Sequence, residues 1–369
     1  MASIAKIKQP QPKDVYKESG VDTDQADAGL QRLIRRVKAT WPPPGANGEV
    51  LRDIGYFANV IKFGRTGLAI CTDGIGSKAL IAQMMDKYDT VGIDCVAMNV
   101  NDLICVGAQP LSMVDYIAVQ TANAELLDAL SIGLAEGARI AGVSISGGEI
   151  SQLPNIINGY RPGFGFDFVG MAVGEVDLDK INFGQDVRHG DIVIGIESNG
   201  IHSNGVTLAR HAFFERENFG LDRKFEELEL QLGAELLRPT HIYVREVMEV
   251  LKSVAGVKAM VHITSDGLLN LTRVAAPVGY VIDTLPPIPP IFSLIQHYAH
   301  VDTPEMYQVY NMGVGFCLVV APTAVDPTLE ILGSCGKKAS VIGRAVADEK
   351  KQVTVNDEIV GQGKRFYRA

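Results

Sequence analysis

Short apolar runs that end in glycine-containing polar turns occur in both halves of the chain, and this feature restricts the fold more than any other. In the first half, residues 68–72 form such a run and continue into a turn at residues 72–78. In the second half, residues 192–197 continue into a turn at residues 198–205. Runs of this length favour buried strands, and helical periodicity in the segments between them predicts helices. The pattern therefore predicts an α/β fold for each half.

The other helices and strands are predicted from periodicity, apolar runs and helix-ending residues. Asn123 is a suitable cap for one helix and Gly142 a suitable end. The first helix has to end before Trp41 because prolines follow it, and its basic residues either form a solvated face or face a phosphate. The predicted helices span residues 23–40, 93–106, 122–141, 206–215 and 239–254, and the further predicted strands span 143–145, 166–176, 259–264, 313–320 and 341–346.

The length of the chain indicates two domains. At 369 residues it is about twice the usual size of a single domain. Residues 177–188 are polar and rich in turn-forming residues, so we place the domain boundary there. We predict an N-terminal arm and helix over residues 1–44, a first domain over 45–176 and a second domain over 185–369.

Charge and cysteine content exclude several classes of protein. A net charge of −9 argues against a nucleic-acid-binding surface. The five cysteines are scattered without C-x-x-C spacing, which indicates neither a zinc site nor a redox pair and is typical of reduced cytoplasmic protein. No stretch reaches the ~18 consecutive apolar residues of a membrane span. The first residues also lack the apolar region of a signal peptide. We therefore expect a cytoplasmic protein without a membrane partner.

The turn at residues 72–78 is the first candidate site. Gly74 and Gly76 let the backbone approach a ligand closely, and consecutive N–H groups can bind an anion. Asp73 offers a hard oxygen ligand for Mg²⁺, and Lys78 offers a positive charge for a phosphate. The turn does not match the Walker A pattern. The alternative interpretation is an ordinary Asp-Gly turn.

The predicted helix at residues 93–106 carries the second candidate. Asp94, Asn101 and Asp102 lie on one stripe of this helix among apolar neighbours. A carboxylate in such surroundings is costly unless it is paired or bound to a metal. With Asp73 nearby, these side chains could form a Mg²⁺–nucleotide site. The alternative is a satisfied internal polar network.

A third turn, at Gly147, Gly148 and Glu149, follows the apolar run at residues 143–145. Here too a predicted strand ends in glycines and then a carboxylate. Two such strand ends and the polar stripe of the helix, all in one domain, are the arrangement expected for a polyphosphate held by a metal ion and backbone N–H groups.

The second half contains two further candidates. Ser203, Asn204 and Gly205 can cap the helix that follows them, and a helix N-terminus suits a substrate phosphate. His202 beside them and His262 at a predicted strand end could contact substrate or transfer a proton. The alternatives are a capping turn with a bystander histidine, and a histidine satisfied within the structure.

Ordered blocks across residues 16–346 resemble one known family. The turn at residues 72–78 (TDGIGSK) resembles the TDGVGTK signature of the phosphoribosylformylglycinamidine cyclo-ligases, also called AIR synthetases. Further blocks of the same family are similar in the same order, at residues 16–22, 92–103 (GIDCVAMNVNDL), 107–116, 147–149, 199–205 (NGIHSNG), 237–244 and 306–315.

The chain departs from the family pattern at three places. In these departures it resembles the archaeal-type branch of the family. Residues 55–58 have fewer glycines than the family's GGFGA loop, which forms the nucleotide lid. Gln152 stands where a carboxylate is usual. Asp266 lies in the block that usually reads H-TGGG.

The resemblance implies an α/β (α+β) fold of two AIR-synthetase-like domains, in a homodimer whose N-terminal sheets pair into a shared barrel. It also implies a reaction, in which MgATP phosphorylates the amide oxygen of formylglycinamidine ribonucleotide. The amidine nitrogen then displaces phosphate from this iminophosphate, and the products are 5-aminoimidazole ribonucleotide, ADP and phosphate.

The expected site residues divide by role. The catalytic candidates are His262, His202 and Asp94. The substrate phosphate is expected at Ser203, Asn204 and Gly205, and Mg²⁺ at Asp73, Asp94 and Glu149. ATP is expected at Asp73, Gly74, Gly76, Lys78, Asn101, Asp102, Gly147, Gly148 and Glu149.

Other functions are compatible with some of the same sequence features. Selenophosphate synthetase, thiamine-phosphate kinase and formylglycinamide amidotransferase have similar carboxylate-rich and glycine-rich ATP sites. The first normally has a reactive Cys near an N-terminal glycine-rich loop, whereas the first cysteine here is Cys71. A non-catalytic nucleotide sensor is a further alternative, which ATP binding without substrate-dependent ADP release would reveal.

Overall fold

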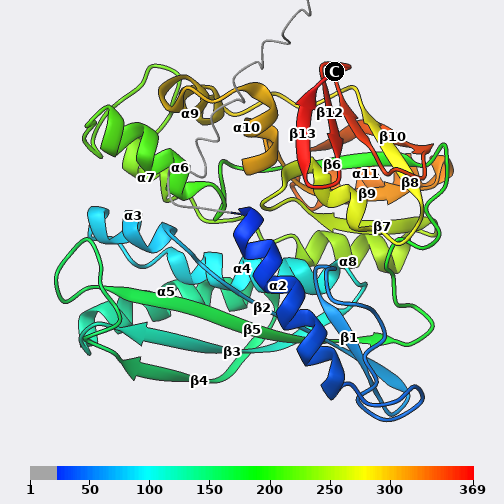
Figure 1. Cartoon of the computed structure of the whole chain (residues 1–369), viewed down its shortest axis with the longest axis horizontal. Helices are drawn as coiled ribbons and strands as arrows, with labels where there is room; N and C mark the ends of the chain where they lie inside the picture. Colours follow the sequence, from blue (N-terminus) through cyan, green and yellow to red (C-terminus); the bar gives the residue numbers. More distant parts are fainter. Residues whose placement is uncertain (1–22) are drawn as a thin grey trace, which may run out of the picture.

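The first half of the molecule is built on a 5-stranded sheet with the order β1-β2-β5-β3-β4 (Figure 1). The computed structural model describes residues 23–369, so the N-terminal arm and the block at residues 16–22 lie outside the described residues. Strand β5 is central and runs antiparallel to β2 and β3, whereas β3 and β4 are parallel. The strands are β1 (Asn59–Phe63), β2 (Thr66–Gly74), β3 (Gln109–Val119), β4 (Ser144–Gln152) and β5 (Phe166–Asp177).

Helices cover one face of this sheet and leave the other open. Along β5, residues alternate strictly between buried and more exposed, beginning with buried Phe166. The buried residues face α4 (Val91–Ile104), which packs against α5 (Ala124–Ala141) and contacts β2, β3 and β5. The first half also contains α2 (Thr23–Val37), a 3₁₀ turn (Lys38–Thr40) and α3 (Lys78–Met85).

Glycines set the close approach of α4 and α5. A Cβ atom at Gly92 of α4 would lie 2.1 Å from the backbone nitrogen of Leu134 in α5. A Cβ atom at Gly133 of α5 would lie 2.7 Å from the carbonyl oxygen of Asp89. Both distances are shorter than real contacts, so only glycine fits at these two positions, and this contact fixes how α4 lies on the sheet.

The second half is built on an 8-stranded sheet with the order β13-β12-β11-β8-β10-β6-β9-β7. Strand β9 is buried along its whole length, which explains its continuous apolar run. The strands are β6 (Ile192–Glu197), β7 (Val257–His262), β8 (Val278–Ile282), β9 (Val314–Val320), β10 (Ala339–Ala347), β11 (Val353–Val355), β12 (Ile359–Gln362) and β13 (Arg365–Arg368).

Short helices surround this sheet. They are α6 (Val206–Arg210), α7 (Leu232–Leu236), α8 (Val244–Ser253), α9 (Pro290–Ala299), α10 (Thr303–Val309) and α11 (Val325–Ser334), with 3₁₀ turns at Gly267–Arg273 and Pro322–Ala324. The predicted helix at 206–215 is present as α6 followed by a π-helical turn, His211–Arg216. Within residues 23–369, no helix is both long and apolar enough to cross a membrane.

Two predicted elements differ from the structure. The strand predicted at residues 143–145 continues through both glycines to Gln152, because Gly147 and Gly148 pair with β3. The helix predicted from residue 239 begins only at Val244. Backbone groups of residues 238–243 instead form hydrogen bonds across the junction between the two halves.

Candidate active site

The polar stripe of α4 lies at the junction between the two halves of the molecule. Asp94 is fully buried there. Its Oδ1 accepts hydrogen bonds from Lys78 Nζ (2.8 Å), from Thr240 N (2.7 Å) and Oγ1 (2.6 Å), and from Ser203 Oγ (3.1 Å). Its Oδ2 is buried without a partner among the described residues. One oxygen therefore carries the contacts and the other is left unpaired.

Lys78 is held between the two halves. Its side chain is fully buried, and Nζ donates to Asp94 and to the carbonyl oxygen of Arg238 at 2.5 Å. Burial lowers the pKa of Lys78, and the charge of Asp94 opposes this shift. A buried ion pair with a further backbone acceptor satisfies both charges, so this lysine is a fixed cation at the junction.

Asn101 and Asp102 of α4 also contact the second half. Asn101 accepts from Tyr243 N at 2.9 Å and donates to the carbonyl oxygen of His241 at 2.8 Å. His262 Nδ1 lies 2.9 Å from Asp102 Oδ1, and its Nε2 lies 3.4 Å from Asn101 Nδ2. Because a carboxylate only accepts, the proton is on Nδ1, which leaves Nε2 as an acceptor.

Asp73 ends β2 close to this group. Its backbone N–H donates to Asn99 Oδ1, and Asn99 Nδ2 donates back to the Asp73 carbonyl oxygen, each at 3.0 Å. Burial, reinforced by the charge of Asp102, raises the pKa of Asp73 to about 6. The following turn has Gly76 at φ 59°, in the left-handed region that favours glycine. The first two candidate sites are thus neighbours, as predicted.

Glu149 is not brought to this group within one chain. Asp115 and Gly148 are register partners, as are Tyr116 and Glu149. A Cβ atom at Gly148 would meet the Asp115 carboxylate. Asp73 and Asp115 both pair with Gly170, so Asp73, Asp115 and Gly148 lie in one row across the sheet. Partners in a row share a face and successive residues alternate, so exposed Glu149 lies on the opposite, open face.

The metal set predicted from Asp73, Asp94 and Glu149 is therefore not assembled in one chain. The described residues contain no group of three or more His, Cys, Asp or Glu side chains placed to hold a metal ion. Asp94 is occupied by Lys78 and by donors from the second half. Asp73 and Asp102 remain as neighbouring carboxylates.

The turn at residues 199–205 closes the other side of the junction. Of the three residues predicted to cap α6, Gly205 is the N-cap, whereas no side chain caps the helix and the Ser203 hydroxyl bonds to Asp94. Gly205 has φ 73°, and Tyr310 packs where a Cβ atom would lie and donates its hydroxyl to the Gly205 carbonyl oxygen at 2.8 Å. Asn204 is half-buried on the same turn.

His202 of this turn is buried and strained. It is 2% exposed, its φ is 59°, and neither ring nitrogen has a partner among the described residues. Burial lowers its pKa well below the usual value, so the ring is neutral. The His241 ring lies 6.0 Å from it, centroid to centroid. A buried, unpaired histidine in a left-handed conformation is the kind of outlier found at functional sites.

Several residues of this site were missed from the sequence. Thr240, Arg238 and Tyr243 contact the α4 and α3 side chains largely through backbone groups, but all three lie in the family block at residues 237–244 and could have been found there. Asn99, which holds Asp73, lies in the GIDCVAMNVNDL block and could have been found there. The contacts of Thr240 depend on how the two halves of the molecule meet, which periodicity does not reveal.

The places where the chain departs from the family pattern lie in different parts of the molecule. Tyr56 is held by Arg52, whose guanidinium lies 4.7 Å from the Tyr56 ring and 4.8 Å from the Phe183 ring. The glycine-poor loop is thus packed against aromatic groups of the chain. Gln152 ends β4 and is exposed, and Asp266 adopts φ 71° with Arg273 3.5 Å away.

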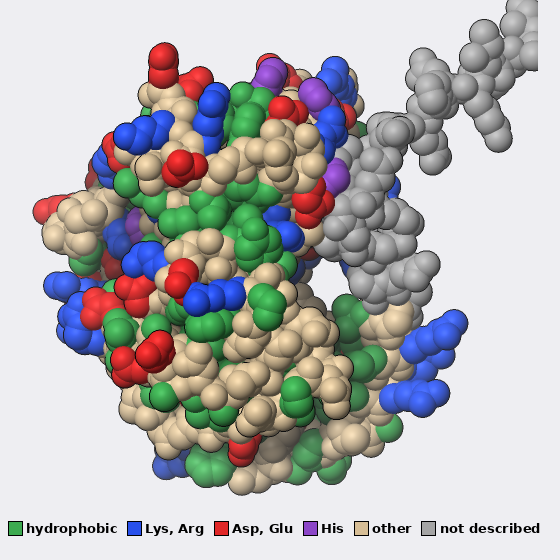
Figure 2. Space-filling model, turned by 90° about the vertical axis from the view of Figure 1, so that its left-hand side faces the viewer, with side chains coloured by type: hydrophobic (Ala, Val, Ile, Leu, Met, Phe, Trp, Pro, Cys, Tyr) green, Lys and Arg blue, Asp and Glu red, His purple; other side chains and the backbone are tan. Residues whose placement is uncertain are grey.

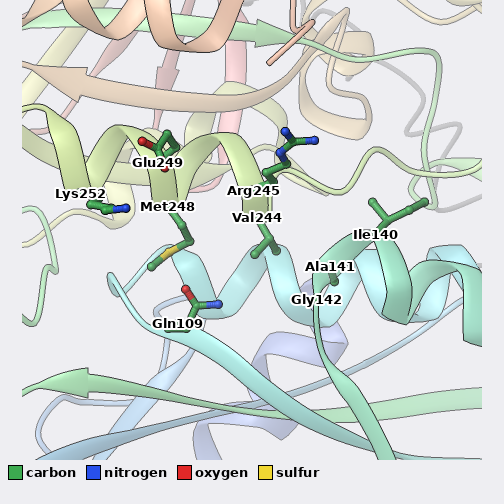
Figure 3. A pocket seen from close by; sticks show the side chains of 9 residues that line it. All are labelled: Gln109, Ile140, Ala141, Gly142, Val244, Arg245, Met248, Glu249 and Lys252. Atoms are coloured by element: carbon green, nitrogen blue, oxygen red, sulfur yellow. The ribbon is translucent and has the colours of Figure 1, made fainter. Parts of the chain in front are cut away.

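A cavity of about 550 Å³ lies away from these residues. It is lined by Gln109, by residues 140–142 at the end of α5 and by one side of α8. Figure 3 shows Val244 and Met248 pointing from α8 toward Gln109, whereas Arg245 and Glu249 point away. None of the predicted site residues lines it, so the candidate active site is the buried polar junction and not this cavity.

Comparison with known proteins identifies similar sequences along most of the chain. Family models described as AIR synthase related protein match their N-terminal domain at residues 55–176 and their C-terminal domain at residues 188–356. Two archaeal relatives described as phosphoribosylformylglycinamidine cyclo-ligase are similar. The one from Methanothermobacter thermautotrophicus is 45% identical, over 92% of this chain and 96% of its own. The one from Methanobrevibacter smithii is 42% identical, over 91% and 95%.

A solved structure shows the same fold at lower identity. The structure described as AaThiL complexed with AMPPCP and TMP aligns with a TM-score of 0.61 and 18% identity, covering 94% of this chain and 98% of that chain. At that identity the likeness concerns the fold alone.

Proposed function

Because the chain belongs to the phosphoribosylformylglycinamidine cyclo-ligase family, we propose that its reaction takes place at the junction between its two halves. The protein is an ATP-using ligase of purine biosynthesis that cyclises formylglycinamidine ribonucleotide to 5-aminoimidazole ribonucleotide, with release of ADP and phosphate. One observation carries the placement: Asp73, Lys78, Asp94 and Asp102 of the first half gather at the buried junction with His202 and His262 of the second.

The proposed chemistry has two steps. The amide oxygen attacks the γ-phosphorus of ATP, the amide nitrogen loses its proton and ADP leaves, which gives an iminophosphate whose carbon is electrophilic. The amidine nitrogen then attacks that carbon and phosphate leaves as the ring closes. The second step is intramolecular, so a site that holds the substrate in a near-attack conformation supplies much of the acceleration. The first step needs charge neutralisation rather than a covalent nucleophile, which suits a site of carboxylates and a lysine.

The residues fit a magnesium ion bound together with ATP. Asp73 and Asp102 are neighbouring carboxylates, and the pKa of Asp73 is raised by burial and further by repulsion from Asp102. Mg²⁺ is usually held by one or two carboxylates plus substrate phosphates. A pair of carboxylates is therefore enough, although the described residues contain no group of three or more metal-binding side chains. We assign Asp73 and Asp102 as its ligands, and the ion would neutralise charge on the transferred phosphate.

Two histidines are assigned to the substrate. His262 is oriented by its Nδ1–H contact to Asp102, and its Nε2 can accept a proton from the substrate nitrogen during ring closure. His202 offers unpaired ring nitrogens to a substrate polar group. The ribose phosphate is assigned to Asn204 and to the backbone N–H groups of residues 203–205, because the Ser203 hydroxyl is used by Asp94.

A test measures ADP and the aminoimidazole product in one reaction, with purified protein, MgATP and formylglycinamidine ribonucleotide. We expect wild type to release both in equal amounts. D73N and D102N should lower kcat/KM by about 10²-fold or more, since each removes charge stabilisation from phosphoryl transfer. D128N, at an exposed position of α5, is the control and should act as wild type. Full activity in both D73N and D102N would place the reaction elsewhere.

We also propose that the protein is a cytoplasmic homodimer joined through the open face of the first sheet. That face carries exposed apolar side chains, including Tyr116 (39%) and Met171 (40%). Figure 2 views the molecule from one end, and its lower part, which belongs to the first half, carries few charged side chains and scattered hydrophobic ones. Exposed apolar side chains gathered on a sheet face are typical of an interaction surface. Pairing two such faces would also bring Glu149 of each chain toward its partner.

A further inference from the structure

We propose that Thr240 is a positioning residue for phosphoryl transfer, which holds Asp94 and through it Lys78. This inference rests on the proposed location of the reaction at the junction. Thr240 is 2% exposed. It belongs to residues 238–243, the segment between α7 and α8 that connects the second half to α3 and α4.

Thr240 makes two hydrogen bonds to one carboxylate oxygen. Its backbone N–H (2.7 Å) and its Oγ1 (2.6 Å) both donate to Asp94 Oδ1, the oxygen that also receives Lys78 Nζ at 2.8 Å. Hydrogen bonds to a buried charge are short and strong compared with neutral ones. The pair of donors on Thr240 therefore determines where the Asp94 carboxylate lies between the two halves.

The position of Lys78 follows from that of Asp94. The ammonium group has three N–H donors, of which Asp94 Oδ1 takes one and the Arg238 carbonyl oxygen takes another. Both acceptors are fixed by the same segment, since Arg238 belongs to it and Thr240 holds Asp94. The remaining N–H of Lys78 can then be aimed at a phosphate oxygen of ATP. Loosening Asp94 would let the ammonium turn away from that direction.

Neighbouring groups do not replace the Thr240 hydroxyl. Ser203 Oγ is 3.1 Å from Asp94 Oδ1 and also 3.1 Å from Thr240 Oγ1, so it divides its contacts between the two. The other oxygen, Asp94 Oδ2, has no partner within the described part of the chain. A carboxylate held by only one of its oxygens depends on every donor to that oxygen, and Thr240 supplies two of them.

The test compares three substitutions by steady-state kinetics on the full-length enzyme. Thr240→Val removes the hydroxyl at nearly constant volume, and we expect kcat to fall by about 10- to 100-fold while each KM changes by less than about 3-fold. Thr240→Ser keeps the hydroxyl and should stay within about 3-fold of wild type. If Thr240→Val does not yield folded protein, Thr240→Ala tests the same hydroxyl.

Thr328→Val is the matched control. Thr328 is fully buried in α11, and its Oγ1 donates to the Ala324 carbonyl oxygen at 2.6 Å, far from the junction. It should lower the melting temperature while leaving kcat unchanged. The inference is overturned if Thr240→Val keeps wild-type kcat, if Thr240→Ser is as impaired as Thr240→Val, or if Thr328→Val loses kcat equally. Failure of the site placement is separate, because it would appear as full activity in D73N and D102N.

Discussion

At the scale of single residues, the side chains predicted to contact ligands are first of all partners of one another. The sequence predicts that Asp94 is functional because it lies among apolar neighbours, where a charge has to be paired, and that Lys78 is functional because it offers a positive charge to a phosphate. That argument holds equally for a protein partner and for a ligand, and the structure supplies the protein partner. His262 and Asp102 were both predicted as site residues, but their mutual contact was not. Residue type indicates the chemistry, whereas the partner depends on the tertiary structure.

The buried histidines make stability depend on pH. Burial lowers the pKa of His241 from 6.5 to about 4, so the unfolded chain binds more protons than the folded one between these values. Stability is therefore fully present above pH 6.5 and is lost as the pH falls toward 4, by up to about 3 kcal/mol for this group. We predict that His241→Gln loses less stability than wild type over this range, as measured by urea unfolding at several pH values.

Asp73 changes the free energy of unfolding with pH in the opposite direction to His241. The effect of His241 therefore has to be measured as a difference between His241→Gln and wild type. The pKa of Asp73 is raised to about 6, so its protonation stabilises the fold as the pH falls from 6 toward 3.8. The control is His189→Gln, at an exposed position, which should follow the wild-type profile. A His241→Gln profile parallel to wild type would show that His241 titrates normally in the folded protein.

At the scale of helices and strands, apolar runs predict well where a strand begins and ends. Segments that contain glycine predict these limits poorly. Strand β6 begins and ends at the predicted residues, and Asn123 caps α5 through hydrogen bonds to two backbone N–H groups, as expected. Strand β4 was expected to end before Gly147, since glycine usually weakens a strand. It continues because β3 supplies backbone partners along its length. The length of β4 therefore depends on pairing with a strand that is distant in the sequence, and no local sequence pattern indicates such pairing.

The contact between α4 and α5 offers a prediction at this scale. Gly92→Ala would place a methyl group against the backbone of α5, which cannot move as a side chain can. We expect a loss of about 3 kcal/mol or more in the free energy of unfolding. Because α4 carries Asp94, Asn101 and Asp102, activity should fall with it. Chemical denaturation together with the ADP assay measures both effects.

Gly333→Ala is the matched control for this substitution. Gly333 lies in the last turn of α11, and a Cβ atom there would meet nothing within 4 Å. Alanine is the better helix former, so the variant should be as stable as wild type or more stable by about 0.5–1 kcal/mol. If Gly92→Ala were equally well tolerated, the two helices would not be in the tight contact described.

At the scale of the whole molecule, the site exists only because the two halves meet. Asp94 and Thr240 are 146 positions apart in the chain, and Lys78 and Arg238 are 160 apart. The family resemblance could predict that both halves contribute to one site. It could not predict which atoms meet, because many contacts at the junction use backbone groups, which residue type does not determine. The family resemblance likewise predicts that two copies of the chain pair through the first sheet, but it does not predict which side chains of the open face meet.

The homodimer can be tested at the centre of that face. Met171 lies on the central strand β5, beside Thr72 on one side and Val114 on the other, and is 40% exposed. In a dimer joined through this face, Met171→Asp would bury an unpaired carboxylate, which costs about 3 kcal/mol or more. Dissociation should then be at least about 100-fold easier. Ile132→Asp, at an equally apolar position of α5 that is 53% exposed, is the control and should remain dimeric. Sedimentation equilibrium distinguishes the cases: a monomeric wild type, or a dimer that survives Met171→Asp, would exclude this face as the interface.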